Sequence, residues 1–124
     1  MSDGNSPAYT YRANIARIVD GDTFDLDIDL GLGVWKRRER VRLYGINVAE
    51  RYTDLGKQAT AFLREMFPPA AINPVIITTF KDESDKYGRY LARIVPVVPA
   101  GWSDLTSLLI EKQFGVPYFG GAWR

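Results

Sequence analysis

Apolar and polar positions alternate along the first third of the chain, as in β-strands that bury one face. The clearest segment is 24–30, where Phe, Leu, Ile and Leu alternate with aspartates. β-branched and aromatic residues indicate two further strands, at 11–19 and 35–46. Asp-Gly and Gly-Leu-Gly turn signals separate the three segments, which predicts a three-stranded meander.

In the rest of the chain, the spacing of apolar residues alternates between the period of a helix and that of a strand. From about Asp54 the apolar spacing is helical, and the helix is expected to close at Pro68-Pro69. Strands are predicted at 75–80 and 89–95, on either side of a charged loop. A second helix is expected after them, with Ser103 as its N-cap and Gly115 at its end.

Three strands, a helix, two strands and a helix is the element order of an OB-type barrel, whose faces and loops often bind nucleic acids. The sequence therefore predicts an α+β, mainly β fold: a five-stranded OB-type barrel with two to three helices. We expect a disordered leader over 1–10 and a single domain over 11–124, a length that can bury a sizeable core.

Strand parity separates the aspartates of the first hairpin. Counting by twos back from Leu30 reaches Asp22, which is therefore expected to face the apolar side. Asp25, Asp27 and Asp29 are expected to face solvent. An inward carboxylate at a strand end needs a partner or a cation, so we interpret Asp22 as a ligand in preference to a turn cap.

Composition narrows the chemistry further. The chain has no cysteine and no histidine, which excludes disulfides, thiolate catalysis, Ser-His pairs and the common zinc sites. Catalysis would have to use carboxylates, arginine, lysine, tyrosine, hydroxyl groups or a hard cation such as calcium or magnesium. The sequence shows neither a membrane span nor a secretory signal, so a cytoplasmic protein is expected.

Charge is patterned although the formal net charge is only +1. A basic run, 36–42, leads into the stretch 40–51, where apolar residues are interleaved with three arginines, an amide and a glutamate. This stretch predicts either a functional site at the end of a buried strand or a strand with one solvated face followed by a charged surface loop.

Three segments carry a resemblance to a known family. They are 19–23 (Val-Asp-Gly-Asp-Thr), 41–50 (Val-Arg-Leu-Tyr-Gly-Ile-Asn-Val-Ala-Glu) and 85–92 (Asp-Lys-Tyr-Gly-Arg-Tyr-Leu-Ala). In this order and spacing they resemble the staphylococcal nuclease (thermonuclease) family. Segments 56–62 and 116–118 extend the resemblance over nearly the whole chain.

The resemblance implies a calcium-dependent endo/exonuclease that hydrolyses DNA and RNA to 3′-phosphate products. Asp22 would be a carboxylate ligand of Ca²⁺, with Asn47 and the carbonyl of Val48 completing the ligand set on the protein. The implied partners are DNA and RNA, preferably single-stranded, with the protein acting as a monomer away from membranes.

The resemblance also implies the catalytic and substrate-binding residues. Glu50 would be the general base that orients the attacking water, while Arg42 and Arg89 would bind the scissile phosphate. Lys86, Tyr87 and Tyr118 would bind the nucleotide. A phosphodiester anion repels a nucleophile, so a cation, arginines and a base are also what the chemistry requires.

The chain departs from the family pattern in the central motif. Asn47 and Ala49 stand where the family carries aspartate and proline. An asparagine removes one negative charge from the calcium site, and an alanine leaves the backbone before Glu50 less restricted. We therefore expect weakened calcium binding, with activity reduced or dependent on high calcium.

A second function class fits the same chain. A non-catalytic OB-fold module could bind single-stranded nucleic acid through basic and aromatic side chains. The candidate residues for this binding are Arg37, Arg38, Arg40, Tyr87 and Tyr118. Asn47 favours such a binding module, whereas the presence of Arg42, Glu50 and Arg89 together favours the enzyme.

Overall fold

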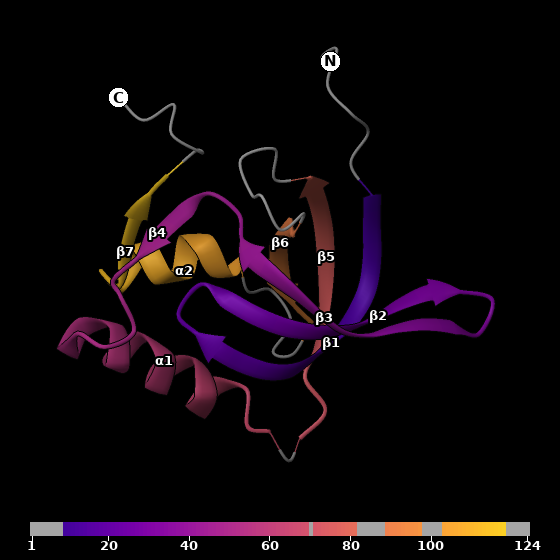
Figure 1. The fold of residues 1–124 in the computed structure, drawn as a ribbon, viewed down its shortest axis with the longest axis horizontal. Coiled ribbons are helices and arrows are strands. Elements are labelled where there is room, and N and C mark those ends of the chain that lie inside the picture. The colour runs from indigo at the N-terminus through magenta and orange to yellow at the C-terminus, as the bar shows by residue number, and fades with distance from the viewer. Residues whose placement is uncertain (1–8, 70, 82–88, 98–102, 119–124) are drawn as a thin grey trace, which may run out of the picture.

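The computed structural model describes residues 9–69, 71–81, 89–97 and 103–118. Five strands close into a barrel in the order β1-β2-β3-β6-β5, in which β3 and β6 are parallel and the other described pairs are antiparallel (Figure 1). The predicted OB-type barrel is thereby confirmed. Its strands are β1 (Tyr9–Asp20), β2 (Thr23–Gly31), β3 (Val34–Leu43), β5 (Pro74–Lys81) and β6 (Tyr90–Pro96).

The barrel encloses one hydrophobic core. Alternate side chains of every barrel strand point inward, and Phe24, Val41, Ile77 and Ile94 are fully buried among them. The first strand begins at Tyr9, two residues inside the segment predicted as a leader, and 1–8 lie outside the described residues.

Two helices complete the described part of the core. Helix α1 (Asp54–Met66) contributes Ala59 and Leu63, which are fully buried against the barrel residues. Helix α2 (Leu105–Glu111) adds Leu105 and Leu109 in the same way. Figure 1 shows the two helices on the same side of the barrel as β4 and β7. Neither of the two described helices has the length and apolar character that crossing a membrane demands.

The segment predicted as one strand over 35–46 is two strands. Gly45 has φ 84°, a left-handed conformation that favours glycine, and it turns the chain out of the barrel. The short strand β4 (Ile46–Val48) follows and pairs with β7 (Gly115–Pro117) in a separate two-stranded sheet. The apolar positions change parity across Gly45, from Val41 and Leu43 to Ile46 and Val48, and this shift was a signal of the break.

The second helix also differs from its prediction at both ends. Its N-cap is Asp104, whose carboxylate accepts a hydrogen bond from the Ser107 amide at 2.8 Å, and not Ser103. Its C-terminal turn places Gln113 at φ 66°, whereas Gly115 lies in β7. A Cβ at Gly115 would lie 2.9 Å from the carbonyl oxygen of Asn47, so this glycine serves the close approach of β7 to β4.

The prediction that Asp25 faces solvent is wrong. Asp25 is only 6% exposed, because the Arg40 side chain on the neighbouring strand covers it with two hydrogen bonds of 2.9 and 3.2 Å. These bonds and the carboxylate charge raise the pKa of Arg40. Asp27 is half-buried, and its carboxylate lies 3.6 Å from Arg37. The acidic and basic runs of the sequence therefore pair with each other across β2 and β3.

This pairing predicts unequal effects of two similar substitutions on β3. Arg40→Gln leaves the buried Asp25 carboxylate without its charged partner, so we expect a measurable fall in the free energy of unfolding. Arg37→Gln removes an exposed contact and should change it by less than about 0.5 kcal/mol. Urea unfolding at neutral pH measures both, and equal losses would contradict the assigned role of the Asp25–Arg40 pair.

Candidate active site

Two aspartates of the first hairpin lie against each other between β1 and β2. The amide of Asp22 donates a hydrogen bond to the Asp20 carboxylate at 3.2 Å, and the Thr23 hydroxyl donates to Asp22 Oδ1 at 3.1 Å. The pairing of β1 with β2 shifts register between Ile18 and Asp20, next to the hairpin. The hairpin thus places two carboxylates at the end of the barrel strands.

Arg42 meets this hairpin from β3. Val41 and Leu43 are buried on either side of it, so Arg42 projects from the outer face of the barrel. Its Nη2 lies 3.7 Å from Asp22 Oδ2, and the Leu43 amide donates to the Asp22 carbonyl at 2.8 Å. Asp22 and Arg42, predicted as site residues from separate motifs, are therefore in contact.

The carboxylate of Asp22 is unusually weakly acidic. Burial, followed by the hydrogen bond and negative charge of Asp20, raises the pKa of Asp22 to about 6 from its ordinary 3.8. The positive charge of Arg42 and the Thr23 hydroxyl act in the opposite direction without offsetting this rise. A second positive charge at this point would relieve the repulsion between the two carboxylates.

Gly21 brings the hairpin close to β4. It is buried, and a Cβ at this position would lie 2.5 Å from Cγ1 of Val48 and 3.2 Å from Cβ of Ala59. The turn between Asp20 and Asp22 therefore packs directly on Val48. Asn47, the neighbouring residue of β4, is exposed.

Glu50 follows β4 and is held by the start of α1. Its carbonyl oxygen accepts hydrogen bonds from the amide of Thr53 at 3.0 Å and from the Thr53 hydroxyl at 2.7 Å. The same hydroxyl caps α1 by accepting from the Gly56 amide at 3.0 Å. These bonds restrain the backbone beside Ala49. The Glu50 carboxylate itself is exposed and accepts a hydrogen bond from the Tyr52 hydroxyl at 3.3 Å.

Two further predicted residues, Arg89 and Tyr118, are described and lie near the elements of this site. Arg89 is half-buried and immediately precedes β6, whose Leu91 pairs with Arg42. Tyr118 is half-buried, and its amide donates to the carbonyl of Gly45 at 3.0 Å, beside the turn that leads into β4. Lys86 and Tyr87 lie outside the described residues.

The oxygen donors near Asp22 are of the kind that calcium prefers. Carboxylates, amide carbonyls and backbone carbonyls are its usual protein ligands. The raised pKa of Asp22 fits a place where a bound cation would be favourable. Across the described residues, however, no group of three or more Asp, Glu, His or Cys side chains is gathered at one point. The oxygen donors of the hairpin are thus of a chemical type that could hold a calcium ion.

Asp20 belongs to this site although the sequence interpretation gave it no role. Its carboxylate accepts the Asp22 amide and contributes to the raised pKa of Asp22. The two residues are separated only by Gly21, and a turn around that glycine brings their side chains together. The repeated aspartate in Val-Asp-Gly-Asp-Thr was the signal that could have identified it.

The raised pKa of Asp22 predicts a pH-dependent stability. Between about pH 4 and pH 6 the unfolded chain has released the Asp22 proton while the folded chain retains it, so stability falls as pH rises through this window. Asp22→Asn removes this loss. At pH 7 the variant should be more stable than the unaltered protein by on the order of 2 kcal/mol, with the difference vanishing below about pH 4. Thermal unfolding at a series of pH values tests this, and a pH-independent difference would contradict it.

At Gly56 the usual stabilising effect of a Gly→Ala substitution in a helix should be reversed. A Cβ at this position would overlap the carbonyl oxygen of Glu50. Gly56→Ala, normally favourable in a helix by about 1 kcal/mol, should therefore lower the free energy of unfolding by about 2 kcal/mol or more. Gln58→Ala, at an exposed position of α1, is the control and should be near neutral. Urea unfolding compares them, and stabilisation by Gly56→Ala would show that the contact with Glu50 is not tight.

Comparison with known proteins adds no relative. No family model matches the chain, and no curated protein matches it. The resemblance to the staphylococcal nuclease family therefore rests on the quoted motifs, and it stays a prediction.

Proposed function

We propose that this protein is a calcium-dependent nuclease that hydrolyses phosphodiester bonds of DNA and RNA, leaving 3′-phosphates. The observation that carries the proposal is the contact of Arg42 with the half-buried Asp22 carboxylate, next to Asp20. This contact would allow a cation on the Asp22 carboxylate and a phosphate group on Arg42 to lie side by side. The motif resemblance supports the same function.

The chain's own residues would divide the catalytic work among them. Glu50, exposed after β4, takes a proton from the attacking water, which adds to phosphorus as the bond to the 5′ oxygen breaks, and the leaving 5′ oxygen takes up a proton from solvent. Arg42 donates hydrogen bonds to the phosphoryl oxygens, and its guanidinium has more donors than the single contact with Asp22 uses. Arg89, on the neighbouring strand edge, is proposed to share this charge stabilisation.

Asp22, Asn47 and the Val48 carbonyl would hold the calcium ion, and Asp20 would add a second carboxylate to the hairpin side. When bound, the ion supplies Lewis-acid stabilisation of the phosphate charge. Asn47 is neutral, so few negative charges face the ion and a high calcium requirement is expected.

The alternative, a non-catalytic module that binds single-stranded nucleic acid, is less well supported at the residues first considered for it. Arg37 and Arg40 each lie beside a carboxylate of β2, so their charges are already compensated, whereas the exposed Arg38 is in no ion pair of the described residues. Tyr118 is half-buried, with its amide bonded to Gly45, and Tyr87 lies outside the described residues. The enzyme is therefore the preferred proposal.

A cleavage assay over a range of calcium concentrations tests the proposal. The unaltered protein should cut single-stranded DNA and RNA, and Asn47→Asp should lower the calcium concentration needed for half-maximal rate by about tenfold. Glu50→Ala should reduce the rate by at least about a hundredfold, because it removes the base. The products should carry 3′-phosphates.

Two controls make the assay decisive. Glu111→Ala removes an exposed glutamate of α2 and should leave cleavage unchanged. Calcium should also raise the melting temperature of the unaltered protein and not that of Asp22→Asn. If none of the variants cuts while single strands still bind without calcium, the binding module is the correct description.

A further inference from the structure

A shallow basic groove lies between β1 and α1, apart from the Asp22–Arg42 contact. Its volume is about 660 Å³. Four cationic side chains line it and one acidic side chain, Glu65, accompanies them. The cations are Arg17 of β1, Arg51 of the loop after β4, and Lys57 and Arg64 of α1.

The charge of this groove is not compensated by neighbouring acids. Among the ion pairs of the described residues, none includes Arg17, Arg51 or Lys57, and none includes Arg64. The basic run of β3 differs, because its Arg37 and Arg40 face carboxylates of β2. Beside α1, four cationic side chains that are in no ion pair among the described residues are thus gathered around one groove.

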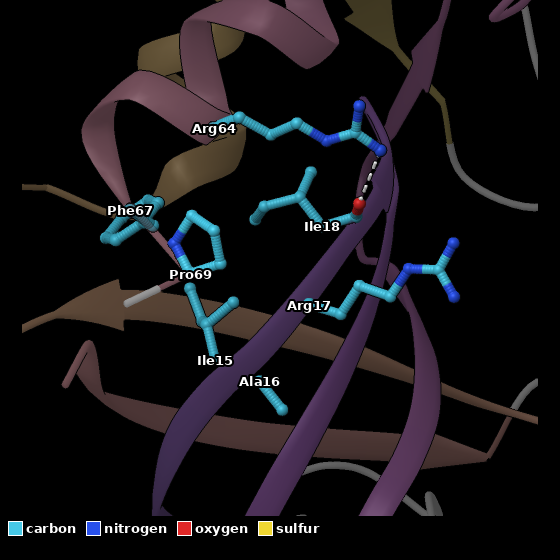
Figure 2. Close-up of a pocket in the computed structure, with 7 residues that line it drawn as sticks. All are labelled: Ile15, Ala16, Arg17, Ile18, Arg64, Phe67 and Pro69. Atoms are coloured by element: carbon cyan, nitrogen blue, oxygen red, sulfur yellow. Dashed lines mark hydrogen bonds between the residues drawn. The ribbon is translucent and has the colours of Figure 1, made fainter. Parts of the chain in front are cut away.

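The two elements that form the groove, β1 and α1, are joined by a hydrogen bond. Arg64 donates a hydrogen bond to the Ile18 carbonyl at 3.0 Å, which ties α1 to β1. Figure 2 shows this bond, with the guanidinium groups of Arg64 and Arg17 beyond the apolar pocket that Phe67 and Pro69 line. Lys57 and Arg64 are seven residues apart on α1, about 10 Å along the helix axis, so the cations are spread along the groove and not gathered at one point.

The groove is also adjacent in sequence to the proposed base. Arg51 directly follows Glu50, so the cationic lining begins next to the proposed cleavage site and continues along α1. A polymer with regularly spaced negative charges is the ligand that such a lining fits. We propose that this groove binds the sugar-phosphate backbone of a single-stranded nucleic acid; the proposal rests on the proposed function for the identity of the polymer.

Binding in the absence of cleavage tests the groove by itself. The probe is a fluorescein-labelled oligothymidine of about 20 nucleotides, titrated in EDTA at several salt concentrations. In the double variant Arg17→Gln/Lys57→Gln, affinity should fall about tenfold or more near physiological salt, and the slope of log K against log salt should decrease by about 1.4. Both positions are exposed, so the fold should persist.

The matched control is Lys36→Gln/Arg37→Gln, which removes the same charge from cations that have carboxylate partners. It should leave both the affinity and the slope nearly unchanged. Equal losses in the two double variants would overturn the groove, as would a failure of the unaltered protein to bind. If the unaltered protein cuts in calcium but the double variant Arg17→Gln/Lys57→Gln binds the oligonucleotide as tightly, the groove proposal is wrong and the nuclease proposal stands. If the double variant has the reduced salt slope but the unaltered protein does not cut, the nuclease proposal is wrong and the groove proposal stands.

Discussion

The exit of the chain from the barrel at Gly45 is the constraint on which the site depends. Gly45 takes a φ of 84°, and the turn is held from several directions. The amide of Tyr44 donates to the Ala92 carbonyl of β6, the hydroxyl of Thr106 donates to the Tyr44 carbonyl from α2, and Tyr118 bonds to Gly45. Without this exit, β3 would continue along the barrel and β4 would not reach the hairpin.

Two close backbone approaches then position the segments beyond the exit. Gly21 allows the hairpin to pack on Val48, and Gly56 allows the first turn of α1 to pack on the carbonyl of Glu50. In both places a Cβ would occupy space already filled. The hairpin, β4 and the start of α1 are therefore positioned by close contacts at glycines. These contacts also determine where the carboxylates of Asp22 and Glu50 lie.

The sequence predicted the barrel well because strand periodicity and element order are local signals. It predicted poorly where a contact between distant segments decides. The solvent-facing parity of Asp25 was sound in itself, yet Arg40 on the next strand covers this carboxylate. The pairing of β4 with β7 and the packing of Val48 on Gly21 likewise join segments far apart in the chain, which periodicity does not reveal.

The same limit applies to charge. From the sequence, the run 36–42 was the obvious basic feature, but its position opposite Asp25 and Asp27 compensates much of it. The cations beside α1 are scattered in sequence from Arg17 to Arg64 and meet only in the fold. The formal net charge of +1 therefore hides two different local arrangements. The arginines of β3 at 37 and 40 lie beside carboxylates, whereas the cations of the groove are in no ion pair of the described residues. Because the field at a surface depends on which charges lack partners, the groove and not the run of arginines is where a polyanion would be attracted.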